Sequence, residues 1–264
     1  MDDPVVRRLR QAPIEVVGRF ADASNATLLV RLTDRDPRPL AAIAEDLGRE
    51  PGLDDLDPAD LAVHKPRQGE RPLWDFPAGT LHLREVAAYE VATALGWDLV
   101  PQTVVRDDGP FGPGSLQRFV PHDPSLHYFS LLEVAEPAVT RQLLQMVVLD
   151  LVIDNADRKG GHVLLEADGT GPGRIRLVDH GVTFNVDRKL RTVAWDFAGR
   201  PVPADLLAAV AGLCGQLSAA LGERLSRLLE EAEVEALRTR ITEVGQLHRL
   251  PEPTGRYPYP WPLL

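Results

Sequence analysis

Two short acidic motifs stand close together in the second half of the chain. The loop Asp-Asn-Ala-Asp-Arg-Lys-Gly-Gly-His at residues 154–162 follows an apolar run, and Asp179-His180-Gly181 follows a short apolar strand. Carboxylates at strand and helix ends can orient a hydroxyl group and hold a divalent cation against phosphate oxygens. Taken alone, the first motif is more typical of a solvated turn. The two motifs together favour phosphoryl transfer, which depends on positioning and charge neutralisation.

A lysine upstream supports this interpretation. The chain contains only three lysines, Lys65, Lys159 and Lys189, and arginine supplies the rest of its 29 basic residues. Such a bias suggests that lysine is kept where a compact ammonium group is needed. Lys65 ends an alternating strand at residues 61–66, and a helical segment that carries Glu85 follows. Because kinases use a strand lysine and a helical glutamate on ATP phosphates, this order favours a kinase over an ordinary surface charge at Lys65.

These elements resemble the phosphatidylinositol 3-/4-kinase superfamily. Their residue pattern is most similar to that of type II phosphatidylinositol 4-kinases and more distantly similar to that of HipA-like bacterial kinases. The similarity runs in order over roughly residues 14 to 190. It implies an α+β, bilobal fold of the protein-kinase-like or phosphatidylinositol 3-/4-kinase-like type. A strand-rich N-lobe is expected at residues 1–120, and a mainly helical C-lobe with a proline-rich tail at residues 121–264.

The resemblance also implies roles for the acidic motifs. Asp157 matches the catalytic aspartate, with Arg158 beside it in the catalytic loop, and Asp179 matches the metal-binding aspartate. His162 stands five residues after Asp157, where the family has an asparagine metal ligand. Imidazole favours softer metals than a carboxamide oxygen does. The sequence therefore leaves three alternatives open. The second metal is held by other residues, or Mn²⁺ is preferred to Mg²⁺, or the kinase activity is weak.

Nucleotide contacts are expected from the N-lobe. Lys65 matches the phosphate-binding lysine, and Glu85 is its expected partner, with Glu90 as the substitute. A strand, turn and strand at residues 16–30 stand where a kinase has its phosphate-covering loop. Because this turn is poor in glycine, its contacts would come from Ser24, Asn25 and backbone amides. A plain hairpin explains the same pattern equally well.

Adenine is expected to meet backbone groups of the strand that leads into the hinge, namely those of Gln117, Phe119 and Val120. The segment between residues 181 and 201 corresponds to an activation segment. It is short and shows no phosphorylation site paired with arginine, so it gives no information on the acceptor.

The elements that must position these residues are short strands and one helix near 82–96, followed by a mainly helical half. A long helix near 136–153 should deliver the catalytic loop, two short strands should follow it, and helices are expected near 203–212, 215–231 and 231–246. The insertion near 33–60 is rich in Asp and Pro and is the least predictable part of the chain.

Composition narrows the function classes. The chain has 264 residues, 44% of them hydrophobic, a net charge of −10 and an isoelectric point near 5.2. A chain of this length and apolar content can form two small lobes. The sequence contains no basic tract, and this disfavours binding to nucleic acid or to an anionic membrane surface. No secretory signal or membrane span is recognisable, and the single cysteine, Cys214, lies in a helical segment. A cytoplasmic location is therefore expected, and a zinc site is disfavoured.

Three functions remain open. The first is an ATP-dependent kinase that uses Mg²⁺ or Mn²⁺ and transfers phosphate to a hydroxyl group of a protein, itself included, or of a small molecule. The second is a phosphoinositide lipid kinase, which would need a basic or apolar membrane-facing surface. The third is a regulatory pseudokinase that binds nucleotide without turnover, suggested by His162 and the glycine-poor turn. Intact Lys65, Asp157 and Asp179 favour the first.

Overall fold

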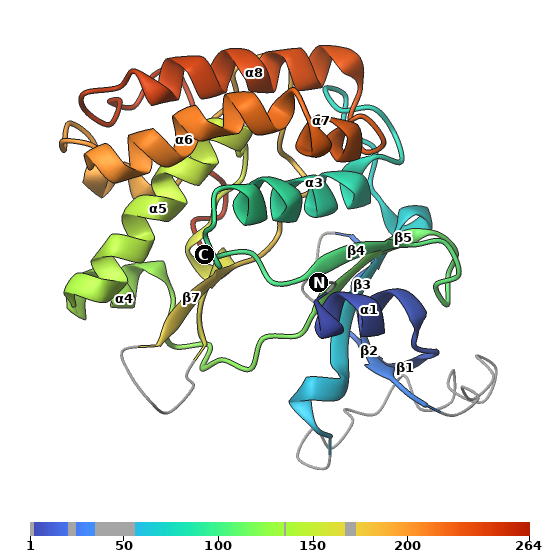
Figure 1. Ribbon diagram of the computed structural model, residues 1–264. Coiled ribbons are helices and arrows are strands. Elements are labelled where there is room, and N and C mark those ends of the chain that lie inside the picture. The colour runs from blue at the N-terminus through green and yellow to red at the C-terminus, as the bar shows by residue number, and fades with distance from the viewer. Residues whose placement is uncertain (1–2, 21–24, 35–55, 135, 167–172) are drawn as a thin grey trace. The chain divides into compact units, whose positions relative to one another are not determined.

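The computed structural model describes residues 3–20, 25–34, 56–134, 136–166 and 173–264 (Figure 1). Two compact units are formed, one from Met1–Val86 with Pro101–Val120 and one from Ala87–Val100 with Pro121–Leu264. The first unit contains a five-stranded antiparallel sheet and the second is mainly helical. The α+β, kinase-like fold class expected from the sequence is therefore confirmed.

The sheet of the first unit is built from the expected alternation of buried and less buried residues. In spatial order its strands are β1 (Ile14–Arg19), β2 (Leu28–Leu32), β3 (Leu61–Pro66), β5 (Gly114–Arg118) and β4 (Thr103–Arg106). Val16, Val30, Ala62 and Leu116 are almost completely buried and form its core. The strand, turn and strand expected near residues 16–30 is the β1–β2 hairpin, and the expected strand at 61–66 is β3.

A helix that the sequence analysis missed packs on this sheet. Helix α1 (Pro4–Gln11) begins after Asp3, whose side chain accepts a hydrogen bond from the Val5 N–H, and it contacts β4 and β5. The Asp-Pro pair at its start is a recognisable initiation signal. Arg106 Nη1 of β4 donates to the carbonyl oxygens of Leu9 and Ala12, at 2.8 and 3.0 Å, and so completes the end of the helix.

Two short 3₁₀ turns flank strand β3, which carries Lys65. Turn η2 (Pro58–Asp60) precedes the strand and η3 (Arg67–Gly69) follows it, and helix α3 (Leu81–Ala94) comes after η3. The boundary between the two units falls inside α3, after Val86. Helix α3 agrees with the expectation near 82–96, and it ends before Gly96, whose φ of 70° suits glycine.

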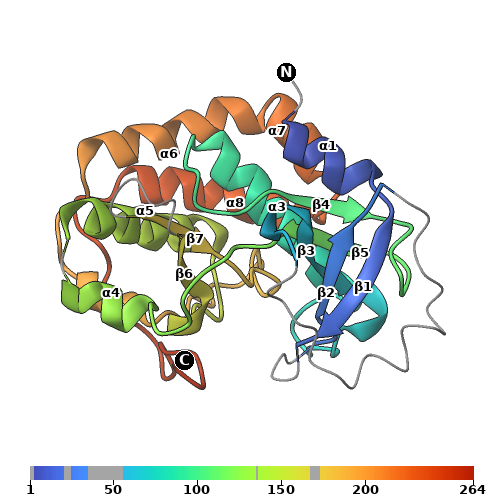
Figure 2. The ribbon, with the colours of Figure 1, turned by 90° about the horizontal axis from the view of Figure 1, so that it is seen from below.

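In the second unit, helix α5 (Pro137–Ile153) lies in the core and leads into the loop at residues 154–162, as expected (Figure 2). The remaining elements are α4 (Tyr128–Val134), η4 (Gly160–His162), the hairpin of β6 (Val163–Glu166) and β7 (Arg174–Leu177), η5 (Ala194–Phe197), α6 (Ala204–Leu217), α7 (Ala220–Leu225) and α8 (Glu231–Gly245). Among the described residues, no helix combines the length and apolar character needed to cross a bilayer.

The prediction of one helix over 215–231 was wrong. The chain leaves α6 after Leu217, forms the short α7, and starts α8 at Glu231. Gly222 lies so close to the end of α6 that a side-chain carbon there would be 2.1 Å from the Leu217 carbonyl oxygen. Periodicity alone does not reveal this close approach, because the leucines continue at helical spacing through the turn.

Candidate active site

The first unit brings Lys65 and Glu85 together. Lys65 Nζ, at the end of β3, forms an ion pair with Glu85 Oε1 of α3, and the glutamate side chain is only 3% exposed. Glu90, the alternative partner, instead pairs with Arg224 at 2.6 Å. An ammonium group held by a buried carboxylate at a strand end is suited to binding phosphate oxygens.

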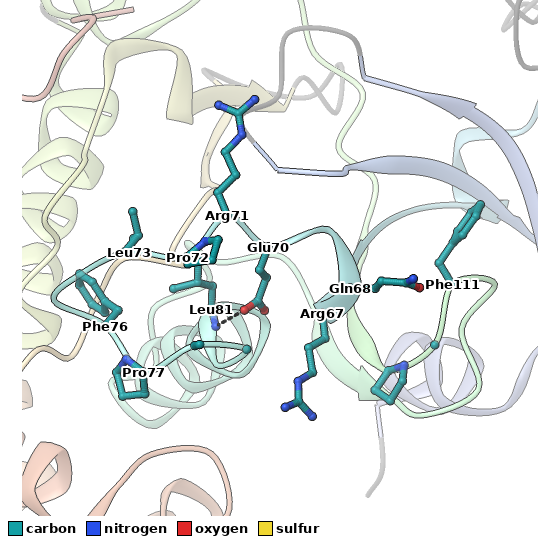
Figure 3. Close-up of a pocket in the computed structure, with 14 residues that line it drawn as sticks. Arg67, Gln68, Glu70, Arg71, Pro72, Leu73, Phe76, Pro77, Leu81 and Phe111 are labelled. Carbon is teal, nitrogen blue, oxygen red and sulfur yellow. Dashed lines mark hydrogen bonds between the residues drawn. The ribbon is translucent and has the colours of Figure 1, made fainter.

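Glu70 fixes the start of the helix that carries Glu85. Its carboxylate accepts hydrogen bonds from the backbone N–H groups of Leu81 (3.2 Å) and His82 (2.9 Å), and His82 Nδ1 lies 2.7 Å from it. Burial alone would raise the pKa of Glu70, but the hydrogen bonds from His82 and Leu81 outweigh it and hold the pKa below its usual value. Figure 3 shows Glu70 pointing at Leu81, one helical turn before Glu85.

A cavity of about 490 Å³ opens beside this cap (Figure 3). Its walls come from the connection between β3 and α3 and from the turn between β4 and β5, and include Arg67, Glu70, Phe76, Leu81 and Phe111. None of the residues proposed from the sequence lines it. In this unit the cavity therefore does not coincide with the residues that the sequence predicts to bind nucleotide.

The β1–β2 turn is only partly described, and Ser24 lies outside the described residues. Asn25 Oδ1 accepts a hydrogen bond from the Arg71 N–H at 2.9 Å, and its carbonyl oxygen accepts one from Thr27 Oγ1 at 3.3 Å. Asn25 therefore ties the turn to the connection after η3. Its proposed contact with phosphate stays a prediction.

The expected adenine-binding strand uses several of its donors internally. Gln117 is paired with β3 and β4 through its backbone, and its Nε2 donates to Thr103 Oγ1 at 2.9 Å. The Phe119 N–H donates to the Leu61 carbonyl oxygen at 3.1 Å, and Val120 is buried. The Gln117 carboxamide and the Phe119 N–H are thus engaged within the sheet, so a base would need other groups of this segment.

In the second unit, the predicted catalytic loop begins with a sharp reversal of the backbone at the end of α5. Asp154 has a left-handed backbone (φ 52°), and its Oδ2 accepts a hydrogen bond from the Lys189 N–H at 2.9 Å. Asn155 Nδ2 donates to Asp150 Oδ1 at 3.0 Å, while Asn155 Oδ1 accepts from the Asp157 N–H at 3.0 Å. The asparagine therefore fixes the backbone of Asp157.

Arg158 lies at the centre of this network and is fully buried. Its Nε and Nη2 donate to the two carboxylate oxygens of Asp150 at 2.9 and 3.0 Å, and its Nη1 donates to the Val178 carbonyl oxygen at 3.0 Å. Nη2 also lies 2.8 Å from His180 Nε2, which must accept because a guanidinium only donates. Arg158 thus links α5, the loop and the Asp-His-Gly triplet, and its predicted part in catalysis stays a prediction.

Asp150 was missed, although the sequence carries a signal for it. A single carboxylate interrupts the apolar run Val-Val-Leu-Asp-Leu-Val-Ile of α5, and its side chain is 2% exposed. A charge in such a run must find a partner, since an unpaired buried charge is strongly unfavourable.

Asp157 keeps access to solvent and has a perturbed carboxyl group. Burial is the largest cause that raises its pKa, to about 6, and the negative charge of Asp179 adds to it. The charge and the hydrogen bond of Lys159, whose Nζ lies 3.3 Å from Asp157 Oδ2, act in the opposite direction. A carboxylate with a pKa of this size can both accept and release a proton near neutral pH, which is what a general base needs.

Asp179 and His162 face one another across the site. His162 Nε2 lies 3.4 Å from Asp179 Oδ2, and the Val178 N–H donates to the His162 carbonyl oxygen at 3.1 Å. Asp179 has a left-handed backbone (φ 60°), a conformation that non-glycine residues adopt at functional sites at some cost. Its side chain is 52% exposed, so the carboxylate is presented to solvent.

The separation of these two side chains suits neighbouring ligands of one divalent cation, which binds nitrogen and oxygen at about 2.0–2.2 Å. No group of three or more His, Cys, Asp or Glu side chains within the described part of the chain could hold a metal ion. A cation at Asp179 and His162 would therefore need phosphate oxygens or water to complete its coordination.

No family model matches the chain. It is 39% identical to Protein Rv2133c of Mycobacterium tuberculosis over 285 residues, which cover 96% of this chain and 93% of that protein. A relative at this identity and coverage shares its fold and its family.

Solved structures are similar at the level of the fold. The Golgi casein kinase has a TM-score of 0.54 and 15% identity, over 95% of this chain and 80% of its own, and its structure with Mn/ADP bound scores 0.53 at 15% identity, over 91% and 74%. The Helicobacter pylori proinflammatory kinase CtkA scores 0.52 at 13% identity, over 91% and 94%. None of these is a phosphatidylinositol kinase, so that narrower resemblance stays a prediction. The chain has a kinase-like fold and belongs to the family of Protein Rv2133c.

Proposed function

We propose that the protein is an ATP-dependent kinase that transfers the γ-phosphate to a hydroxyl group of a protein, itself included, or of a small molecule. The observation that carries this proposal is the solvent-accessible pair of carboxylates, Asp157 and Asp179, held on one hydrogen-bonded network by the buried Arg158. The Lys65–Glu85 ion pair of the first unit supports it. So does the kinase-like fold, since a structural relative was solved with Mn/ADP bound.

In this proposal each residue has one task. Lys65 binds phosphate oxygens of ATP, and Asp179 and His162 hold Mg²⁺ or Mn²⁺. Asp157 orients the acceptor hydroxyl and takes its proton as the new oxygen–phosphorus bond forms and the bond to ADP breaks. The ammonium group of Lys159, 3.3 Å from Asp157, offsets negative charge there. The cation, when bound, neutralises charge that develops on the phosphates.

Nucleotide binding should be visible as thermal stabilisation. ATP with a divalent cation, at about 100 times its dissociation constant, should stabilise the protein by ~2.7 kcal/mol. Lys65→Ala and Asp179→Asn should each reduce the rise in melting temperature. Asparagine is used at position 179 because it tolerates the left-handed backbone. Arg10→Ala and Asp187→Ala, at exposed positions, are the matched controls. An unreduced rise in both test variants would place the nucleotide elsewhere.

The metal preference tests His162. If its imidazole is a ligand, Mn²⁺ should support ATP binding and transfer better than Mg²⁺, and His162→Asn should shift the preference toward Mg²⁺ by several-fold. The exposed His248 provides the control, His248→Asn. Titration calorimetry of nucleotide with each metal gives the ratio of affinities. The same ratio in wild type and His162→Asn would remove His162 from the coordination shell.

The reaction itself is tested with labelled ATP. Purified protein is incubated with Mg²⁺ or Mn²⁺, and label is followed into the protein, into added lipid vesicles, into small hydroxyl compounds and into free phosphate. The position of His162 favours one second candidate, a nucleotide-binding pseudokinase with a regulatory role. Stabilisation by ATP without transfer to any acceptor, and without hydrolysis, would support that candidate over the kinase.

A further inference from the structure

Residues 256–264, which we call the strap, form an irregular segment with several bends beside the catalytic loop of the same unit. The strap is the red loop marked C in Figure 2. It contains neither helix nor strand. The sequence motif Tyr-Pro-Tyr-Pro-Trp-Pro explains this conformation, because prolines at alternate positions exclude both a helix and a sheet ladder.

The strap is bonded to two segments that flank Asp157. The Gly160 N–H donates to the Leu263 carbonyl oxygen at 2.8 Å. Further along the chain, the Thr192 N–H and Trp195 Nε1 both donate to the Pro258 carbonyl oxygen, at 3.1 and 2.9 Å. The strap therefore holds the loop after Asp157 at one point and the segment after the Asp-His-Gly triplet at another.

Gly160, the first attachment point, lies next to residues of the proposed transfer site. Gly160 begins η4, which ends at His162, the contact of Asp179. Lys159, the contact of Asp157, immediately precedes Gly160. A displacement of Gly160 would therefore move both contacts at once.

The surroundings of Gly160 leave no room for a side chain. A methyl group there would lie 2.8 Å from Cε2 of Phe129 and 3.2 Å from Cδ1 of Leu264. The next residue differs, since a methyl group on Gly161 would meet only the Leu264 carbonyl carbon, at 3.9 Å. Gly160 is thus enclosed between α4 and the strap, whereas Gly161 is exposed.

We propose that the strap is a positioning element of the transfer site, which sets the place of Lys159 and His162 through Gly160 and so orients Asp157 and Asp179. The proposal rests on the proposed kinase function. Small displacements of catalytic groups reduce rates strongly while leaving the binding of distant parts of a substrate intact. Disturbing the strap should therefore lower the transfer rate more than the affinity for ATP.

Gly160→Ala tests this directly. We expect its kcat for transfer to fall by about tenfold or more, while its KM for ATP stays within a few-fold of wild type. The fall should exceed that of Gly161→Ala by roughly tenfold. Circular dichroism and the melting temperature establish that both variants are folded.

Trp195→Phe is a milder second variant. It keeps an aromatic ring but removes the donor to Pro258, so the kcat of Trp195→Phe should fall several-fold with little change in the KM for ATP. Trp261→Phe makes the same chemical change on an indole that is 87% exposed and should have the smaller effect. This pair remains informative if Gly160→Ala does not fold.

Hydrogen exchange measured by NMR gives a readout that does not depend on activity. The Gly160 amide should be protected in wild type and exchange about tenfold faster or more in Trp195→Phe, but not in Trp261→Phe. Unchanged exchange would show that the strap does not hold the loop, and faster exchange with unchanged kcat would show that the hold is irrelevant to transfer. Either result overturns the proposal. If wild type transfers no phosphate, the kinase function fails, and exchange at Gly160 alone decides whether the strap holds the loop.

Discussion

Asp157→Asn should lower phosphoryl transfer by roughly 10²-fold or more and leave the affinity for ATP within a few-fold of wild type. The side chain is assigned to orient the acceptor hydroxyl and to take its proton, and both tasks are performed mainly in the transition state. Asparagine retains the shape of aspartate but accepts no proton at neutral pH. Steady-state kinetics with labelled ATP, with Asp187→Asn as an exposed control, measure the difference.

The pH dependence gives an independent check on the same residue. Burial, together with the charge of Asp179, raises the pKa of Asp157 to about 6, so the carboxyl group is increasingly protonated as the pH falls below 6. The value of kcat/KM in wild type should therefore decline on the acid side of pH 6, and the residual activity of Asp157→Asn should lack that decline. Wild-type turnover that Asp157→Asn leaves unchanged would contradict the assignment.

The stability of the fold should change with pH in the opposite direction to the activity. Because the pKa of Asp157 is higher in the folded protein than its ordinary value of 3.8, this residue stabilises the fold most below that value, and the contribution disappears as the pH rises through about 6. Above pH 6 the partly buried charge costs stability. At pH 7 Asp157→Asn should therefore unfold at a slightly higher temperature than wild type, even though it is the less active protein.

Arg158→Ala should destabilise the fold by about 3–5 kcal/mol, since it leaves the Asp150 carboxylate charged and buried without its partner. Both side chains of this pair are at most 2% exposed. The matched control is Arg188→Ala, which breaks an exposed ion pair with Glu243 and should cost about 0–1 kcal/mol. Urea unfolding at pH 7 gives both free energies. A cost below about 1 kcal/mol for Arg158→Ala would show that the network does not hold the loop.

The elements that local pattern determines could be predicted. Helix α5, the hairpin after it and strand β3 follow from apolar periodicity, and the helix and the strand deliver Asp157 and Lys65 to their places. Glu85 as the partner of Lys65 was also predictable from the order of strand and helix. Helix α1 had a recognisable Asp-Pro start, and only its shortness concealed it.

Contacts between residues distant in sequence could not be predicted. The role of Arg158 depends on Asp150 one helical turn before the loop and on His180 beyond the hairpin, and nothing in the local pattern separates a buried arginine from a catalytic one. The strap meets Gly160 across about a hundred residues of chain, so its bond to the loop is invisible to any periodicity.

The buried carboxylate of Asp150 inside α5 also affects how the protein folds. Until Arg158 reaches Asp150, the helix carries a charge into an apolar interior, and the core of the second unit cannot close around it without a large cost. We therefore expect the loop to dock on α5 while the core of this unit forms, rather than after the core is complete. Damage to the network should appear in cells as a loss of protein abundance before it appears as a loss of catalysis, because chaperones and proteases act on the unfolded fraction.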